Sequence, residues 1–178
     1  MKKRISFTCL ILLVFLFYAC ATQPPPSPNW RGEEEAIHLR VRADSQLNLH
    51  EGRPHTLVLC IYQLRSKTTF NYLTDEIDGR YKLLECEIFD ASVVNAKRLI
   101  IQPGEDMTLL MDRRGGARHL TFVAGYFLLQ KRRIIKMVDF PVIVEKKGFG
   151  GQKTTARVGK LKLELVLGAQ QIDRIEKR

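Results

Sequence analysis

Short runs in which apolar and polar residues alternate recur along most of the sequence. The clearest run covers residues 161–167, where leucine occupies every second position before Gly168. Residues 37–43 alternate in the same way, because isoleucine, leucine, valine and alanine are separated by one histidine and two arginines. A period of two residues is typical of a β-strand with one buried face. Such strands predict a sheet that packs its apolar face against a second layer.

Further runs of this kind are separated by glycine and proline turn signals. The predicted strands are residues 37–43, 55–64, 98–102, 107–112, 120–130, 134–138 and 157–167, with residues 142–145 as an eighth candidate. The run 55–64 is apolar on both faces, which indicates a strand that is covered on both sides. Seven or eight short strands favour an all-β, antiparallel β-sandwich, here over residues 36–168.

Two segments depart from the strand pattern. Within residues 66–90, apolar residues recur at helical spacing from Phe70 until an Asp-Gly pair at 78–79 interrupts them. We therefore expect a partly helical insertion with one or two short helices. After Gly168, residues 169–178 form a polar tail, for which we expect a short frayed helix.

The first residues have the order of a secretory signal. Three basic residues at positions 2–4 precede an almost unbroken apolar run over residues 5–17, and small residues surround Cys20. The run is shorter than the roughly 20 residues of a membrane-spanning helix, so residues 1–19 are predicted to be a cleaved signal peptide. Residues 20–35 then form a tether, whose four prolines favour an extended chain.

Residues 17–20, Phe-Tyr-Ala-Cys, resemble a bacterial lipobox. In a lipobox the cysteine thiol receives a diacylglycerol and the new amino terminus is acylated, as by palmitate, so the resemblance implies a lipid on Cys20. Each buried methylene of an acyl chain contributes about 0.8 kcal/mol to membrane binding. The alternative is an ordinary signal peptide with a chance cysteine. No aspartate follows Cys20, so the enteric sorting rule predicts the periplasmic face of the outer membrane.

Two cysteines remain once the leader and the lipid are accounted for, Cys60 and Cys86. The periplasm permits oxidation, so these two thiols are candidates for a disulfide. The alternative is a free thiol, because Cys60 lies in a strand-like run where a small thiol behaves as an apolar residue. The sequence leaves both possibilities open.

The chain is basic, with a formal net charge of +10 at pH 7. At a membrane surface this balance suggests acidic lipid, lipopolysaccharide or an acidic protein partner. Nucleic acid is not expected as a partner, because the protein is predicted to lie in the periplasm. The basic residues at predicted turns either face such an anionic surface or are simply solvated. They are Arg113, Arg114, Arg118, Lys131, Arg132, Arg133, Lys146, Lys147 and Lys153.

No motif for catalysis is found. No serine stands in a nucleophile elbow, and no cysteine lies in a reactive motif with a recognisable base. His50, Glu51 and His55 lack further ligands nearby and are better explained as surface residues than as a metal site. Residues 148–155 are rich in glycine but do not fit a phosphate-binding loop. We therefore expect no enzyme, no metal and no cofactor besides the covalent lipid.

Five segments carry a resemblance to a known family. They are residues 44–48 (Asp-Ser-Gln-Leu-Asn), 51–54 (Glu-Gly-Arg-Pro), 58–64, 103–105 (Pro-Gly-Glu) and 123–126 (Val-Ala-Gly-Tyr). In this order after a lipobox they look like the TssJ family, the outer-membrane lipoproteins of type VI secretion systems. The resemblance covers nearly the whole mature chain. It implies a transthyretin-like β-sandwich with a helical insertion, held to the outer membrane by lipid.

The resemblance also implies a partner. Family members bind the periplasmic carboxy-terminal part of the inner-membrane protein TssM, which with TssL completes an envelope-spanning complex, and the loop between the first two strands makes the contact. In this sequence the matching loop is residues 47–54, an apolar anchor inside a charged rim. The expected contact residues are Leu47, Asn48, Leu49, His50, Glu51, Gly52 and Arg53. Alternatively, Leu47 or Leu49 turns inward and closes the end of the sandwich.

Two other functions remain open at this point. The first is a periplasmic lipoprotein that binds a glycan or another envelope protein, and the second is a lipoprotein hydrolase. Glycan binding by the purified domain would favour the first. Activity that one substitution abolishes would be needed for the second.

Overall fold

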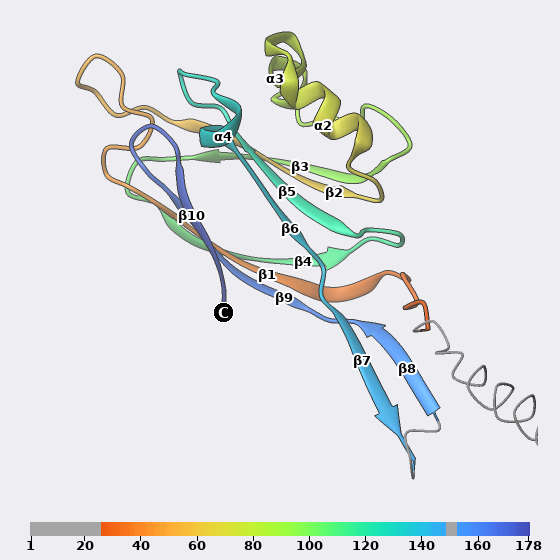
Figure 1. Ribbon diagram of the computed structural model, residues 1–178. Helices are drawn as coiled ribbons and strands as arrows, with labels where there is room; N and C mark the ends of the chain where they lie inside the picture. The colour runs from red at the N-terminus through yellow and green to blue at the C-terminus, as the bar shows by residue number, and fades with distance from the viewer. Residues whose placement is uncertain (1–25, 149–152) are drawn as a thin grey trace, which may run out of the picture.

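The computed structural model describes residues 26–148 and 153–178, in which two four-stranded sheets pack face to face (Figure 1). A separate two-stranded hairpin projects from one end. The predicted β-sandwich is confirmed, but these residues form ten strands rather than seven or eight. The predicted signal peptide, residues 1–19, the lipid candidate Cys20 and the first residues of the tether lie outside the described residues.

The first sheet has the strand order β10-β9-β1-β4. Its strands are β1 (Glu33–Ala43), β4 (Asp106–Arg113), β9 (Leu161–Leu167) and β10 (Ile172–Lys177). β1 pairs antiparallel with β4 but parallel with β9. The expected all-antiparallel pairing therefore has one exception, at the centre of this sheet.

The prediction of a frayed helix in residues 169–178 is wrong, because β10 pairs antiparallel with β9. Its two apolar residues, Ile172 and Ile175, are three positions apart, which is a helical spacing. The register shifts between Ile172 and Arg174, and this irregularity allows both isoleucines to reach the core. A bulge therefore gives a strand the sequence pattern of a helix.

The second sheet has the order β3-β2-β5-β6 and is antiparallel throughout. Its strands are β2 (Leu57–Leu64), β3 (Val93–Ile101), β5 (His119–Ala124) and β6 (Ile135–Asp139). Nearly every residue of β2 is buried, which confirms the prediction of a strand covered on both faces. The predicted strand over residues 120–130 ends early, because residues 125–130 leave the sheet before α4 (Lys131–Ile134).

The projecting hairpin consists of β7 (Val142–Lys147) and β8 (Lys153–Val158). The single strand predicted over residues 157–167 is divided into β8 and β9 at Gly159. Gly159 donates its N–H to the carbonyl of Pro141 at 2.8 Å. A Cβ at this position would lie 2.9 Å from Cδ1 of Ile143, so the close approach favours glycine. The chain turns here from the hairpin into the sandwich.

The main core lies between the two sheets. In β1, Ile37, Leu39 and Val41 point inward and are fully buried, whereas the residues between them point outward, as the alternation predicts. They pack in one cluster with inward residues of the other strands, which include Leu57, Leu59, Ile61, Leu120, Phe122, Leu161, Leu163 and Leu165.

The helical insertion covers the outer face of the second sheet (Figure 1). It contains α2 (Thr68–Asp75) and α3 (Ile77–Leu83), which confirms the expected short helices. The helices meet at Glu76, and Gly79 packs so closely that an added Cβ would overlap the backbone of Leu73. None of the helices in the described part of the chain is long and apolar enough to cross a membrane.

The insertion is joined to β2 by a disulfide between Cys60 and Cys86, whose Cα atoms are 5.1 Å apart. The hydroxyl of Tyr62 donates a hydrogen bond to the carbonyl of Leu83 at 2.7 Å. Burial of this hydroxyl raises the pKa of Tyr62 to about 12. A second, smaller core forms around these residues and explains why the outward face of β2 is apolar.

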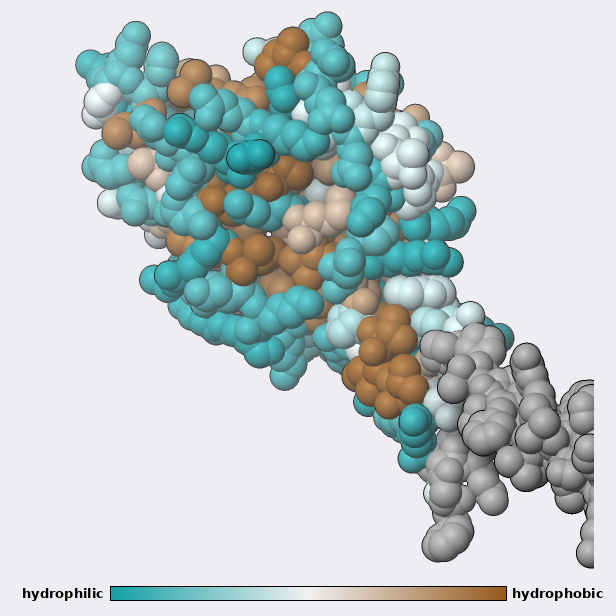
Figure 2. Space-filling view, viewed as in Figure 1, coloured by the Kyte–Doolittle hydropathy of each residue, from teal (hydrophilic) through white to brown (hydrophobic). Residues whose placement is uncertain are grey.

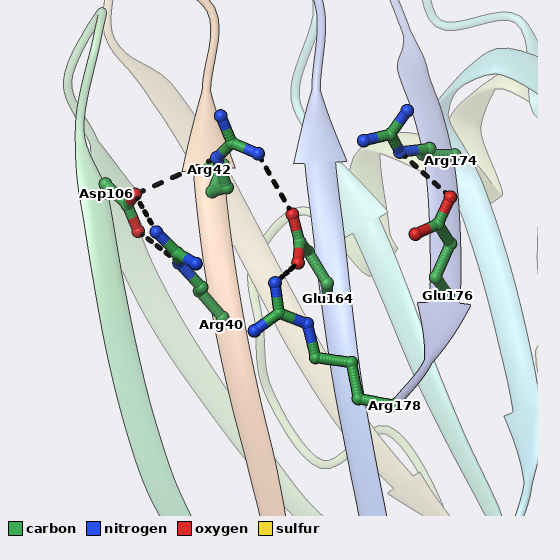
Figure 3. Close-up of polar contacts among 7 residues, drawn as sticks. All are labelled: Arg40, Arg42, Asp106, Glu164, Arg174, Glu176 and Arg178. Carbon is green, nitrogen blue, oxygen red and sulfur yellow. Dashed lines mark hydrogen bonds and ion pairs between the residues drawn. The ribbon is translucent and has the colours of Figure 1, made fainter.

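The outer face of the first sheet carries charged side chains instead (Figure 3). Arg40 binds Asp106 with two hydrogen bonds of 2.8 and 2.6 Å, and Arg42 donates to Glu164 at 3.1 Å. Arg178, at the end of the chain, also pairs with Glu164. The hydrogen bond from Arg40 lowers the pKa of Asp106, and the hydrogen bond from Arg42 lowers the pKa of Glu164. This network joins β4, β1, β9 and the residue after β10.

The sandwich has two ends that differ in composition. β1 and β9 pair in parallel from Ile37 opposite Leu161 to Ala43 opposite Leu167. The start of β1 therefore lies beside the junction of β8 and β9, and its end lies beside the turn before β10. We call the end formed by residues 44–56, 125–130 and 168–171 the loop end. The end formed by residues 26–32 and by β7 and β8 is the hairpin end (Figure 1).

Candidate partner-binding site

The predicted contact loop, residues 47–54, lies at the loop end and finishes in a tight turn. His50 and Arg53 exchange two backbone hydrogen bonds, of 3.0 and 2.9 Å. The residues between them, Glu51 and Gly52, have φ values of 49° and 72°. Positive φ at both central positions is typical of the two-residue turns that close β-hairpins. The turn exposes Glu51, Gly52 and Arg53 to solvent.

Asn48 holds this loop against its neighbours. Its φ is 49°, a left-handed conformation that asparagine adopts more readily than most residues. The side-chain amide donates to the carbonyl of Thr56 at 3.0 Å, and its oxygen accepts from the N–H of Phe127 at 3.1 Å. The next residue, Leu49, donates its N–H to the carbonyl of Ala169 at 2.7 Å. The three segments of the loop end are thus fixed to one another.

Two of the expected contact residues, Leu47 and Asn48, are buried and stabilise the fold. Leu47 is fully buried in the main core, so the inward orientation that the sequence left open is the one adopted. Asn48 is also buried, at 6 % exposure. In the free chain both side chains therefore hold the loop in place, and their contact with a partner stays a prediction. Leu49 is half-buried, and His50 is exposed.

Three aromatic rings, those of His50, His55 and Phe127, pack together at the loop end. The ring of His50 stacks on Phe127 with centroids 4.0 Å apart, and His55 meets the same ring edge-on at 5.1 Å. Phe127 and its neighbour Leu128 are both more than half exposed. Sequence reasoning missed these two residues, because it placed them inside the strand predicted over residues 120–130. The sequence feature that could have identified them is the unbroken apolar run after Gly125.

A hollow of about 80 Å³ lies between the three segments. Its lining residues are Asn48, Leu49, His50, Tyr126, Phe127, Leu128, Ala169 and Gln170. The hydroxyl of Tyr126 lies beneath this surface, within 2.7 Å of the carbonyl of Gln171 and 3.1 Å of the carbonyl of Gly168. Burial, with the nearby carboxylates of Asp173 and Asp44, raises the pKa of Tyr126 well above its ordinary value. The phenol therefore stays protonated and acts as a hydrogen-bond donor.

Charged groups border the apolar surface. Nε2 of His50 lies 3.9 Å from Oε1 of Glu51, and both Glu51 and Arg53 project into solvent. An exposed aromatic and aliphatic centre inside a charged rim is the usual composition of a protein interface. Among residues 26–148 and 153–178, no cluster of three His, Cys, Asp or Glu residues is placed to hold a metal ion. The arrangement favours binding of a protein partner.

The sequence matches a family model over residues 35–167, and that model describes the type VI secretion lipoproteins VasD, EvfM and TssJ. The chain belongs to the TssJ family. Members of this family are structural, membrane-bound lipoprotein components of the secretion system and not enzymes. No curated protein matches the sequence.

Solved structures show the same fold. TssJ1 from Pseudomonas aeruginosa has a TM-score of 0.56 at 24% identity, with 87% of this chain and 98% of that chain covered. Lip from Serratia marcescens, a membrane-bound component of the type VI secretion system, has a TM-score of 0.53 at 18% identity, with 80% and 96% covered. A chain in the structure described as the T6SS protein TssM C-terminal domain from EAEC has a TM-score of 0.57 at 14% identity, with 79% and 96% covered. At these identities the likeness concerns the fold.

Proposed function

We propose that this TssJ-family protein anchors the type VI secretion membrane complex to the outer membrane by binding the periplasmic C-terminal domain of a TssM-like protein. The observation that carries the proposal is the exposed pair Phe127 and Leu128, held beside His50 within a charged rim. Exposed aromatic side chains such as Phe127 are enriched in the cores of protein interfaces. TssL would be reached only indirectly, through the TssM-like protein.

The positions of the two ends of the sandwich relative to the tether support this role. The first described residues lie at the hairpin end, and the loop end lies at the other end of the sandwich (Figure 1). A lipid on Cys20 would therefore hold the hairpin end near the membrane and leave the loop end directed toward the periplasm. That lipid is the single non-protein group that the proposal requires.

The anchor is tested by the substitution Cys20→Ser. We expect the variant to be released from the outer-membrane fraction without loss of folding, because Cys20 precedes the sandwich in the sequence and the lipid is not expected to be part of its core. Membrane fractionation and circular dichroism measure the two effects. A Cys20→Ser protein that still sediments with outer membranes would contradict the anchor.

The partner is tested by titrating the soluble domain, residues 29–178, with the periplasmic C-terminal domain of the TssM-like protein from the same organism. We expect saturable binding in a calorimeter. If a folded domain does not bind, the proposed partner is wrong and a glycan or another envelope protein becomes the better candidate.

A further inference from the structure

The β7–β8 hairpin has one apolar face. Val142 lies opposite Val158, and Val144 lies opposite Ala156. Directly opposed residues of an antiparallel pair point to the same side. These four residues therefore share a face, on which Val142 and Val144 are each 45% exposed. Figure 2 shows the hydrophobic residues of β7 as a brown patch on the projecting hairpin.

The opposite face is more polar. Arg157 donates to Glu145 at 2.9 Å, and Thr155 is exposed beside them. By sequence, residues 142–158 contain three lysines and one arginine but one glutamate. The hairpin therefore combines an apolar strip with an excess of positive charge, and Lys146 continues the apolar face toward the tip. This combination is typical of segments that lie on anionic membrane surfaces.

The hairpin has little support from the rest of the molecule. Among the described residues, its two strands pair only with each other, and neither of the four-stranded sheets extends into it. Its base is fixed because Val158 is buried in the main core and Gly159 bonds to Pro141. A two-stranded sheet is marginally stable in water unless a further layer covers its apolar face. A surface that covers Val142 and Val144 would supply that layer.

The described end of the tether lies at the base of this hairpin. The carbonyl of Trp30 accepts a hydrogen bond from Gly116 at 2.7 Å, and the guanidinium of Arg118 lies 5.5 Å from the centre of the Trp30 ring. The carbonyl of Arg118 in turn accepts from the N–H of Phe140, two residues before β7. Trp30 is thus held at the base of the hairpin.

Chain length then limits the distance to the membrane. Trp30 lies ten positions after Cys20, and ten extended residues span at most about 36 Å. The six residues of β7 project by about 20 Å from that base. The membrane that holds the lipid is therefore within about two hairpin lengths of the base of the hairpin.

We propose that the apolar face of the β7–β8 hairpin lies on the anionic phospholipid surface of the membrane that holds the lipid of Cys20. The inference rests on the lipid anchor of the proposed function. The acyl chains hold the protein, and the hairpin adds a second contact, with basic residues near the phosphates. Two contacts fix the direction of the sandwich, so the loop end faces away from the membrane.

The test uses the full lipidated chain and a matched pair of variants. Val144→Trp places an indole on the apolar face, whereas Thr155→Trp places one on the opposite face of the same hairpin. Both proteins are incorporated into vesicles of equal parts phosphatidylglycerol and phosphatidylcholine with brominated acyl chains, which quench indole fluorescence. Trp30 is present in both, so the difference between the variants reports the hairpin. We expect at least about twofold stronger quenching for Val144→Trp, and a smaller difference in vesicles of phosphatidylcholine alone.

Each outcome decides the inference. Equal quenching of two variants that float with the vesicles would overturn the hairpin contact and leave the anchor intact. A wild-type protein that does not float would overturn the anchor and the inference together. Binding to the TssM-like domain is measured separately and is independent of both results. If Val144→Trp does not fold, Val142→Trp on the same face replaces it.

Discussion

The loop end and the hairpin end both expose apolar side chains, but they hold them in different ways. At the loop end, three segments are joined by the hydrogen bonds of Asn48, Leu49 and Tyr126. At the hairpin end, Val142 and Val144 lie on β7, which among the described residues pairs with β8 alone. A surface that is rigid before binding loses little entropy when a partner of matching shape binds it. A lipid surface has no fixed shape, so a simple amphipathic hairpin is sufficient for it.

The largest expected effect is a loss of stability that leaves partner binding unchanged. Replacing Cys60 and Cys86 by alanine should lower the free energy of unfolding by about 3–4 kcal/mol, because the disulfide closes a long loop; the cysteines are 26 positions apart. The disulfide lies beneath the helical insertion and neither cysteine lines the hollow at the loop end, so partner affinity should not change. Denaturant titration and calorimetry measure the two quantities. Loss of affinity in a folded variant would show that the insertion and the loop end are coupled.

A smaller effect is expected from Asn48→Ala, which loosens the loop end. The variant loses two hydrogen bonds and forces alanine into a left-handed conformation, which together should cost about 2–3 kcal/mol of stability. Asn48→Gly is the matched control, because glycine adopts positive φ without strain and loses only the hydrogen bonds. Denaturant titration should therefore rank the wild type above glycine and glycine above alanine. Equal stability of all three proteins would contradict the role assigned to Asn48.

The charged rim should contribute less than the apolar centre. The double substitution Glu51→Lys and Arg53→Glu reverses both charges without changing the net charge. We expect a several-fold loss of partner affinity, mainly through slower association and strongest at low salt, because exposed charges steer encounter. Stopped-flow or surface-based kinetics measure the association rate. An unchanged rate at low salt would move the electrostatic contact away from this turn.

The smallest effect on stability is expected from the charged network on the outer face of the first sheet, between the two ends. Glu164 and Asp106 have lowered pKa values in the folded protein, so their contribution to stability is complete above the ordinary values of 4.5 and 3.8. It is lost as the pH falls through the lower, folded values. Denaturation at a series of pH values should show this decline, and Glu164→Gln should flatten it. An identical pH profile for the variant would mean that Glu164 does not contribute.

The sequence predicts regular parts of this fold well, because alternation is a direct consequence of burying one side of a strand. This explains the success for β1 and β9. β2 is predicted from a continuous apolar run instead, because both of its faces are covered. The sequence predicts poorly where the backbone departs from regular geometry. The bulge in β10 produces a helical spacing, and the apolar run after Gly125 resembles a strand although Phe127 and Leu128 are exposed. The inward turn of Leu47 depends on packing, which alternation does not report.

We propose that the apolar centre of the loop end, Phe127 and Leu128, binds the TssM-like partner. The most direct test of this proposal is a calorimetric titration of two double variants with the partner's periplasmic C-terminal domain. The first is Phe127→Ala with Leu128→Ala, residues that are 51% and 56% exposed, and the control is Ile100→Ala with Leu110→Ala, which are 50% and 53% exposed elsewhere. We expect the first variant to bind at least about tenfold more weakly and the control to bind like the wild type. Equal affinities of the two folded variants would contradict the assignment of the partner to the loop end.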